Sequence, residues 1–334
     1  MPKKLKIGIV GMGFIADFHF KGFNQNPDAE ITGMSQDFYG DKNKIDQMKK
    51  ELNRKCSEWN IKAYNNFDEM AEDPEIDAII IGSINPYHFE QIKKGFASGK
   101  HLLVEKPVVT DLNHLKIIKE IYSGSKMKIF PGHNFVYRNS VIKAKDLIEK
   151  GELGQIIQGS ITAAHTISEA HSKGWRAKKE LSSGGALMDS GHHVVYQSLF
   201  LLGKPVKLQA FKSKMILKNM DGEDTAQINL LYPDSSMGVI LQSWGSNFGS
   251  TINGIRIFGS KGEIAITDAL YFNGKKVDAD VDFANSFVNQ AKAFSDYILY
   301  DKEPLSDLND AENTLKIIYG AYESAEKDIV VNIF

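Results

Sequence analysis

Short apolar runs alternate with amphipathic stretches through the first third of the chain. Ala78–Ile81 is apolar at every position, which is typical of a parallel strand that helices cover on both faces. We therefore expect an α/β fold that starts with a doubly wound parallel sheet. The runs predict strands at Leu5–Val10, Ile31–Ser35, Ala78–Ile81, Leu102–Glu105 and Lys128–Pro131.

Between these runs, helices are predicted at Lys42–Trp59, Tyr87–Ala97 and Leu112–Tyr122. The first is the clearest, because its apolar residues recur at steps of three or four and form one stripe that faces a sheet. Cys56 belongs to this stripe, so we interpret it as a buried packing thiol rather than a nucleophile.

After about residue 150 the pattern changes to strict alternation of apolar and polar positions. Alternating runs flank the turn Pro233-Asp234-Ser235, and Asn273-Gly274 marks another tight hairpin. We expect a second α/β domain with a large, mostly antiparallel sheet and a domain boundary that gives residues 1–134 and 135–334. Its helices are predicted at Asp189–Leu202, Ser286–Tyr300 and Asp310–Ala325.

Composition excludes several classes of protein. With 334 residues, 42% of them hydrophobic and 25% charged, the chain is globular. A net charge of −2 provides no basic field for nucleic acid or an anionic membrane, and no apolar run reaches the ~18–20 residues that span a bilayer. One cysteine excludes an internal disulfide framework. Three lysines before an apolar stretch superficially resemble a signal peptide, but Gly8, Gly11, Gly13 and Asp17 argue against one, so we expect a cytoplasmic protein.

The segment Gly11-Met12-Gly13-Phe14-Ile15-Ala16 follows the first strand and opens a helix. In this context it matches the dinucleotide-binding fingerprint, with alanine at the third glycine position. Gly11 permits the tight turn, Gly13 lets the backbone approach a pyrophosphate, and Ala16 lets helix and strand pack closely. We therefore predict a nicotinamide dinucleotide site here.

The end of the second strand should carry the residue that binds the adenosine ribose. Asp37 lies 24 positions after Gly13, close to the ~20 expected for an acidic residue that binds the ribose 2′-hydroxyl. A carboxylate repels a 2′-phosphate, so NAD is favoured over NADP. Gln36 beside it and Lys42 nearby leave NADP open.

Two further motifs carry candidate chemistry. Glu105-Lys106-Pro107 ends a later strand of the same sheet, where ligands of open α/β sheets bind. The glycine-rich segment from Ser182 to His193 places Asp189 four positions before His193, which would lie on one face of a helix. Asp189 could then orient the imidazole for proton transfer, although a helix cap and a core histidine would also explain the pair.

Taken together, these motifs resemble the Gfo/Idh/MocA family of NAD(P)-dependent oxidoreductases of sugars, inositols and related polyols. The resemblance also includes Asn85-Pro86 with His88, Tyr137-Arg138, the segment 151–154 and Trp175-Arg176, all in order along most of the chain. It implies a Rossmann domain followed by an α/β domain whose large sheet often mediates dimers or tetramers. Gln36 departs from the family pattern, because many members place the ribose-binding aspartate there.

The resemblance implies that Lys106, Asp189 and His193 form the catalytic set. We expect His193, oriented by Asp189, to take the hydroxyl proton, because histidine needs almost no pKa change to act near neutral pH. We expect Lys106 to stabilise the developing charge on the substrate oxygen. The other predicted substrate contacts are Tyr137, His165, Trp175 and Arg176. The predicted cofactor contacts are Gly11, Met12, Gly13, Phe14, Ile15, Ala16, Gln36, Asp37, Ser83, Asn85, His88, Glu105 and Lys106.

Several alternatives stay open at this point. An NAD-dependent glycoside hydrolase would use transient oxidation and accumulate no NADH, and a non-catalytic NAD(P)-sensing regulator would bind the cofactor without turnover. Asp189, His193 and His165 could form a metal site, but no ligand spacing supports one, so we expect no metal. The expected partners are a small-molecule polyol or sugar and further copies of the chain, in a homodimer or homotetramer. We expect no nucleic acid and no membrane.

Overall fold

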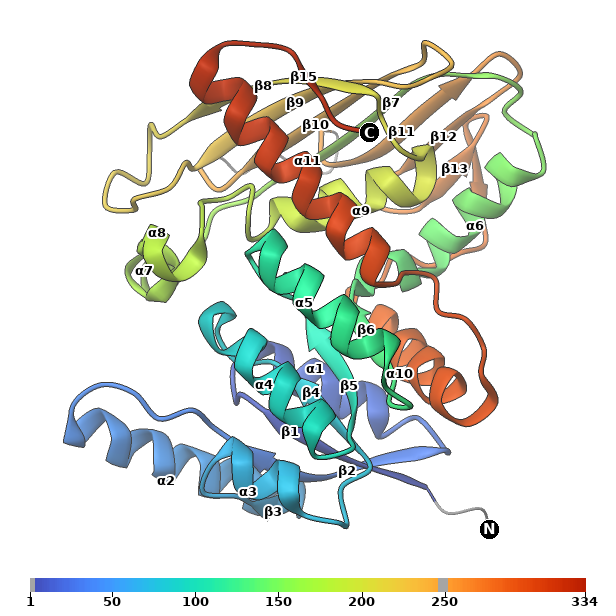
Figure 1. Cartoon of the computed structure of the whole chain (residues 1–334). Coiled ribbons are helices and arrows are strands. Elements are labelled where there is room, and N and C mark those ends of the chain that lie inside the picture. Colours follow the sequence, from blue (N-terminus) through green and yellow to red (C-terminus); the bar gives the residue numbers. More distant parts are fainter. Residues whose placement is uncertain (1–3, 246–251) are drawn as a thin grey trace. The chain divides into compact units, whose positions relative to one another are not determined.

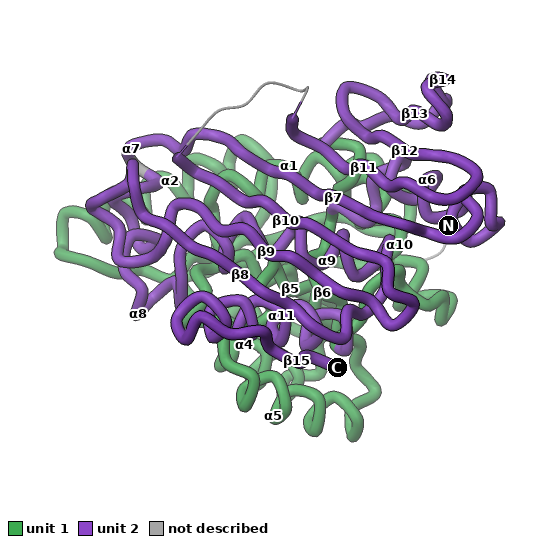
Figure 2. The backbone as a smooth tube through the Cα atoms, turned by 90° about the horizontal axis from the view of Figure 1, so that it is seen from above, with its two compact units in different colours: residues 1–134, 284–308 green, residues 135–283, 309–334 purple. Residues whose placement is uncertain are grey.

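The computed structural model describes residues 4–245 and 252–334. The chain divides into two compact units, shown in Figure 2: unit 1 contains residues 1–134 and 284–308, and unit 2 contains residues 135–283 and 309–334. The segment 284–308 lies late in the sequence but belongs to unit 1.

Unit 1 contains a six-stranded parallel sheet with the order β3-β2-β1-β4-β5-β6. The predicted doubly wound sheet is confirmed, and β1 and β4 have their predicted bounds. Ile79, Ile80 and Ile81 are 0% exposed, as expected for a strand that is covered on both faces. The strands are β1 (Leu5–Val10), β2 (Ala29–Ser35), β3 (Lys62–Ala63), β4 (Ala78–Ile81), β5 (His101–Glu105) and β6 (Ile129–Gly132).

The helices of this unit start at short polar residues that cap them. Asp41, Asn66 and Asp111 each accept a hydrogen bond from a backbone amide in the first turn of α2, α3 and α5, respectively. Cys56 on α2 is buried, as its place in the apolar stripe predicted. The helices are α1 (Phe14–Phe23), α2 (Lys42–Trp59), α3 (Phe67–Glu72), α4 (Asn85–Ala97), α5 (Leu112–Ser123) and α10 (Phe283–Tyr300), labelled in Figure 1.

Helix α10 joins unit 1 because its apolar face packs on α1. The ring of Phe294 meets the edge of Phe23 at 6.2 Å, and the ring of Phe287 lies 5.4 Å from that of Phe18. Asn26 donates a hydrogen bond to the carbonyl oxygen of Ala291 at 2.9 Å. These contacts join residues more than 250 positions apart, so local periodicity could not reveal them.

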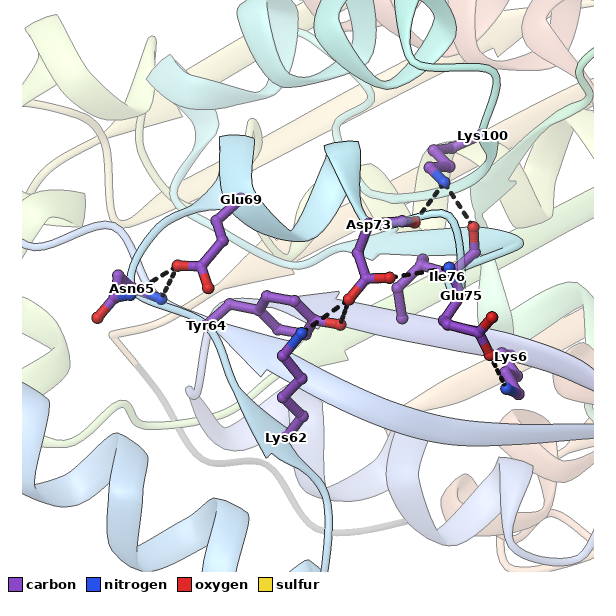
Figure 3. Close-up of polar contacts among 9 residues, drawn as sticks. All are labelled: Lys6, Lys62, Tyr64, Asn65, Glu69, Asp73, Glu75, Ile76 and Lys100. Carbon is purple, nitrogen blue, oxygen red and sulfur yellow. Dashed lines mark hydrogen bonds and ion pairs between the residues drawn. The ribbon is translucent and has the colours of Figure 1, made fainter.

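A polar cluster around Asp73 holds the amino-terminal edge of the sheet in unit 1, as Figure 3 shows. The side chains of Lys62 and Tyr64 donate to one carboxylate oxygen of Asp73, and the amide of Glu75 donates to the other. Lys100 donates to the carbonyl oxygens of Asp73 and Ile76, just before β4 and β5 begin. The cofactor-binding residues predicted from the sequence belong to the opposite, carboxyl-terminal edge.

Unit 2 contains a nine-stranded sheet with the order β14-β13-β12-β11-β7-β10-β9-β8-β15. Its neighbouring strands are antiparallel except for β7 and β10, which pair in parallel, so the predicted mostly antiparallel sheet is confirmed. The strands are β7 (Ile156–Ala164), β8 (Lys207–Ser213), β9 (Thr225–Leu231), β10 (Met237–Ser243), β11 (Gly254–Gly259), β12 (Glu263–Ile266), β13 (Leu270–Phe272), β14 (Lys275–Val277) and β15 (Val331–Asn332).

Helix α9 packs on the central strands β7 and β10 of this sheet. It begins at Gly191 rather than at the predicted Asp189, which lies in the preceding turn. The other helices are α6 (Asn139–Glu149), α7 (Glu169–Lys173), α8 (Lys179–Ser182) and α11 (Leu308–Lys327), and short 3-10 turns cover Asn134–Tyr137 and Trp175–Ala177. Within residues 4–245 and 252–334, no helix combines the length and the apolar character that a bilayer span requires.

Candidate active site

The glycine turn lies between β1 and α1, where the strand order of the sheet reverses. Gly11 has a φ of +98°, and a Cβ there would overlap the carbonyl oxygen of Gly82 at the end of β4. At Gly13, the residue that precedes α1, a Cβ would have no atom within 4 Å. The turn is thus closed toward the sheet at Gly11 and open at Gly13, which leaves room for a phosphate next to the first amides of α1.

Two side chains hold the peptide groups on either side of Met12. Its amide donates to Oε1 of Gln36 at 2.9 Å, and its carbonyl oxygen accepts from Nζ of Lys55 at 3.2 Å. Lys55 is buried on α2 and also pairs with Asp17 at 2.9 Å. The turn is therefore fixed from β2 and from α2, and the sequence analysis did not single out Lys55.

The remaining residues of the fingerprint begin α1. Ala16 is 1% exposed, which agrees with a small residue at the contact between helix and strand. Phe14 is 72% exposed and packs edge-on against Phe18 at 4.8 Å, and Ile15 is half-buried. These positions fit a bound dinucleotide, with the open side at Gly13 and Phe14.

Asp37 and Gln36 make different contacts at the end of β2. Nε2 of Gln36 donates to the backbone oxygen of Asp37 at 2.9 Å. The carboxylate of Asp37 instead accepts from Nε2 of Gln91 on α4 at 2.9 Å, and Oε1 of Gln91 accepts from the hydroxyl of Ser83 at 2.6 Å. Burial raises the pKa of Asp37, and the hydrogen bond from Gln91 opposes this rise.

His88 joins two loops at the carboxyl edge of the sheet. One ring nitrogen lies 3.1 Å from the carbonyl oxygen of Ser83 after β4, and the other lies 3.0 Å from that of Pro107 after β5. The ring is 1% exposed, and burial lowers its pKa. Because both nitrogens face backbone carbonyls, His88 positions the loops, and Asn85, one turn earlier at the start of α4, is also buried.

Glu105 is the last residue of β5, and Lys106 follows it directly. Glu105 lies 2.8 Å from Nε2 of the buried His19, and its second oxygen accepts from the backbone amide of Lys106 at 3.2 Å. Burial lowers the pKa of His133, which follows the neighbouring strand β6, to about 3, and the charge of Lys106 contributes to this shift. Lys106 follows the last residue of β5 and therefore lies at the predicted edge of the sheet.

In unit 2, Asp189 lies in the turn before α9 and forms an ion pair with Arg176. Nε2 of His171 is 3.7 Å from the same carboxylate oxygen. The guanidinium of Arg176 in turn lies over the ring of Trp175 at 4.3 Å. Three of the predicted substrate residues, Trp175, Arg176 and Asp189, are therefore adjacent, and the charge of Asp189 is balanced by an arginine.

His193 is in the first turn of α9, and its Nδ1 lies 2.7 Å from the hydroxyl of Tyr196. The same hydroxyl accepts from the backbone amide of Phe135 at 3.0 Å. The ring of Phe135 stacks on the imidazole at 4.3 Å, and the guanidinium of Arg138 lies 3.8 Å from the centre of the Phe135 ring. The residue in contact with Nδ1 is thus Tyr196, which the sequence analysis missed although it lies three positions along the same helix.

The two remaining candidates of unit 2 differ in exposure. Tyr137 is 2% exposed. His165, which follows β7, is exposed. Partial desolvation lowers its pKa, an effect that the charge of His171 reinforces and that of Asp189 opposes. A neutral His165 can donate a hydrogen bond to a hydroxyl group or accept one from it.

The glycine-rich segment before Asp189 is held by Glu223, a second residue without a sequence signal. A Cβ at Gly185 would overlap the backbone of Glu223, so only glycine allows this approach. The Glu223 carboxylate accepts from the amide of Leu187 at 2.9 Å and from the hydroxyl of Tyr322 at 3.0 Å, and burial raises its pKa. These contacts fix the turn that carries Asp189.

Within unit 1, the structure brings the predicted cofactor residues to one edge of the sheet, and within unit 2 it brings Trp175, Arg176 and Asp189 together. In the described ranges 4–245 and 252–334, no three histidine, cysteine or acidic side chains are grouped so that they could hold a metal ion.

Comparison with known proteins identifies both units. Residues 5–133 match the family model described as an oxidoreductase family with an NAD-binding Rossmann fold, and residues 141–265 match the GFO/IDH/MocA C-terminal domain. The chain is 24% identical to myo-inositol 2-dehydrogenase of Thermotoga maritima, over 97% of each chain. It is 23% identical to the D-xylose 1-dehydrogenase (NADP(+)) of Haloarcula marismortui, over 81% of this chain and 78% of the relative.

Among solved structures, aldose-aldose oxidoreductase from Caulobacter crescentus, complexed with glycerol, has the same fold. It superposes with a TM-score of 0.87 at 22% identity and covers 99% of this chain and 100% of its own. The fold, the glycine turn and both family models agree: the chain is an NAD(P)-dependent oxidoreductase of the Gfo/Idh/MocA family.

Proposed function

We propose that this protein is a dehydrogenase that transfers a hydride between a nicotinamide cofactor and a hydroxyl-bearing carbon of a sugar, inositol or related polyol. The observation that carries the proposal is the glycine turn, which is closed by Gly82 at Gly11 and open at Gly13. The family membership and the names of the inositol and xylose dehydrogenases support the substrate class.

The cofactor would be held by the backbone from Gly11 to Ala16, by Asp37 and by the loops after β4 and β5. Ser83, Asn85, Glu105 and Lys106 lie in or next to these loops. His88 holds the two loops, and Gln36 holds the glycine turn. When bound, the nicotinamide ring supplies the acceptor or donor of the hydride. The protein contributes position and proton transfer.

We propose that Lys106 and His193 share the proton chemistry. His193 takes the hydroxyl proton at Nε2, and Lys106 donates a hydrogen bond to the developing carbonyl oxygen. Nδ1 of His193 lies 2.7 Å from the Tyr196 hydroxyl, so a neutral imidazole that carries its hydrogen on Nδ1 can donate it to the Tyr196 oxygen. We propose that this contact with Tyr196 orients the imidazole of His193.

We propose that the ion pair of Asp189 and Arg176 contacts the substrate. A carboxylate that is already paired with a guanidinium offers acceptors and donors to hydroxyl groups without a net charge. Together with Trp175 and a neutral His165, this arrangement suits an uncharged polyol better than an anionic sugar. Tyr137 completes the proposed substrate contacts.

We further propose that the protein works in the cytoplasm as a homodimer or homotetramer. On the face of the sheet of unit 2 that α9 does not cover, Leu231, Met237 and Phe258 alternate with buried residues and are 38%, 52% and 41% exposed. An apolar face of this kind fits a second copy of the chain. Sedimentation of the purified protein tests the assembly.

The test of the function is a screen of sugars and cyclitols with NAD and NADP separately, with NADH or NADPH absorbance as the readout. We expect reduced cofactor to accumulate with at least one polyol. Cleavage of aryl glycosides without accumulated NADH would instead indicate the glycoside hydrolase, and tight NAD binding without any turnover would indicate a regulator.

A further inference from the structure

Gln36 occupies the position at which many family members bind ribose, but its amide is used within the protein. Its oxygen accepts from the amide of Met12, and its nitrogen donates to the backbone oxygen of Asp37, both at 2.9 Å. This arrangement braces the glycine turn. The ribose must therefore be recognised by another residue at the end of β2.

Asp37 is the neighbouring candidate, and a chain of hydrogen bonds orients its carboxylate. Ser83 donates to Oε1 of Gln91 at 2.6 Å, and Nε2 of Gln91 donates to Oδ2 of Asp37 at 2.9 Å. The opposite orientation of the Gln91 amide would put its oxygen against the carboxylate oxygen, which is repulsive, so the network permits one orientation.

The network is rigid at its far end. Gln91 is 5% exposed, and the backbone of Ser83 is held by the buried ring of His88, which also contacts the carbonyl oxygen of Pro107. Asp37 is therefore connected through α4 to the loop that carries Lys106. A side chain fixed in this way loses little freedom when a ligand binds.

We infer that Gln91, held by Ser83, is a positioning residue that fixes the carboxylate of Asp37 for the ribose hydroxyls, and that this network sets how strongly the protein prefers NAD over NADP. The inference rests on the proposed function. A carboxylate can accept several hydrogen bonds, so Asp37 retains acceptor sites for ribose hydroxyls beside the Gln91 contact. The same negative charge repels a 2′-phosphate.

The experiment measures the dissociation constants of NAD and NADP by calorimetry, on the full-length protein and without substrate. Three variants are compared with the wild type: Asp37→Asn, Gln91→Leu and Ser83→Ala. Two controls accompany them. Gln36→Ala removes the brace of the glycine turn, and Gln290→Leu makes the same change as Gln91→Leu at a buried glutamine on α10.

We expect the wild type to bind NAD at least tenfold more tightly than NADP. Asp37→Asn should bring the ratio close to one, and Gln91→Leu and Ser83→Ala should lower it in the same direction. Gln36→Ala should weaken both dinucleotides by a similar factor, and Gln290→Leu should leave the ratio unchanged. Ser83→Ala removes one hydroxyl only, so it keeps the test valid if Gln91→Leu does not fold.

Equal affinity of the wild type for the two dinucleotides, or an unchanged ratio in Asp37→Asn, would overturn the inference. An unchanged ratio in both Gln91→Leu and Ser83→Ala would overturn the part that assigns the positioning to Gln91. These results differ from a failure of the proposed function. If neither dinucleotide binds, the function and the inference both fail, and if the ratios are as expected but no polyol is oxidised, only the function fails.

Discussion

We expect opposite effects on stability when each of the two glycines of the turn is replaced by alanine. At Gly13 the backbone has φ −68° and ψ 179°, which alanine adopts freely, and its Cβ would meet no atom within 4 Å. At Gly11 the φ is +98° and the Cβ would overlap the carbonyl oxygen of Gly82. Only Gly11→Ala should therefore perturb the fold.

The expected changes in the free energy of unfolding follow from these conformations. Gly13→Ala should leave the free energy of unfolding unchanged or raise it by ~0.4–1 kcal/mol, because alanine restricts the unfolded chain. Gly11→Ala should lower it by at least ~1–2 kcal/mol, the cost of a left-handed conformation with a side chain. If a pyrophosphate lies against Gly13, the added methyl group should weaken NAD binding at least tenfold, about 1.4 kcal/mol.

The assay combines urea unfolding without dinucleotide and calorimetric NAD binding for the wild type and both variants. The expected pattern is a Gly13→Ala protein of native stability that binds NAD poorly. If Gly13→Ala binds NAD as tightly as the wild type, no phosphate approaches this residue and the interpretation of the turn is wrong. A large loss of stability in Gly13→Ala would contradict the open space that the structure shows.

Three further results are expected. Lys55→Met removes the hydrogen bond to the Met12 carbonyl oxygen and the ion pair with Asp17. The free energy of unfolding in urea should fall by ~1–3 kcal/mol, and NAD should bind more weakly. If both values are unchanged, Lys55 does not hold the glycine turn. The pKa of His133 is lowered to about 3 in the folded protein, so between pH 3 and ~6.5 the unfolded chain binds a proton that the folded chain does not. The free energy of unfolding should therefore fall as the pH drops through this range, by up to ~1.4 kcal/mol per pH unit. Unfolding curves of His133→Asn should lack this part of the slope, and an equal slope would refute the assignment. Burial raises the pKa of Cys56 to about 11, so a disulfide reagent at pH 8 should label it only in urea, and rapid labelling of the folded protein would contradict its burial.

The pattern of apolar residues was sufficient to predict the bounds of elements that bury a regularly spaced or continuous set of side chains. Helix α2 and strand β4 have their predicted bounds, because one apolar stripe and one fully apolar run define them. The start of α9 was predicted two residues early. Asp189 resembled a helix residue in spacing, but its carboxylate pairs with Arg176 in the preceding turn, and no local signal reveals that partner.

The contacts that organise the site come from residues distant in sequence. Gln91 lies in the middle of α4 and looks like any polar helix residue until Asp37, 54 positions earlier, is placed beside it. Tyr196 could have been considered, because it is one helical turn from His193, but its bond to the Phe135 amide depends on the fold of unit 2. Spacing along the chain therefore does not predict how these side chains are oriented.

The most direct test of the proposed chemistry follows the hydride itself. For a polyol that the screen identifies, the substrate is prepared with deuterium on the carbon that is oxidised, and the NADH formed is analysed by mass spectrometry. We predict NADH that carries one deuterium, with formation lost in Lys106→Met and in His193→Asn. NADH without the label, or full activity in both variants, would contradict the proposal that these residues serve a direct hydride transfer.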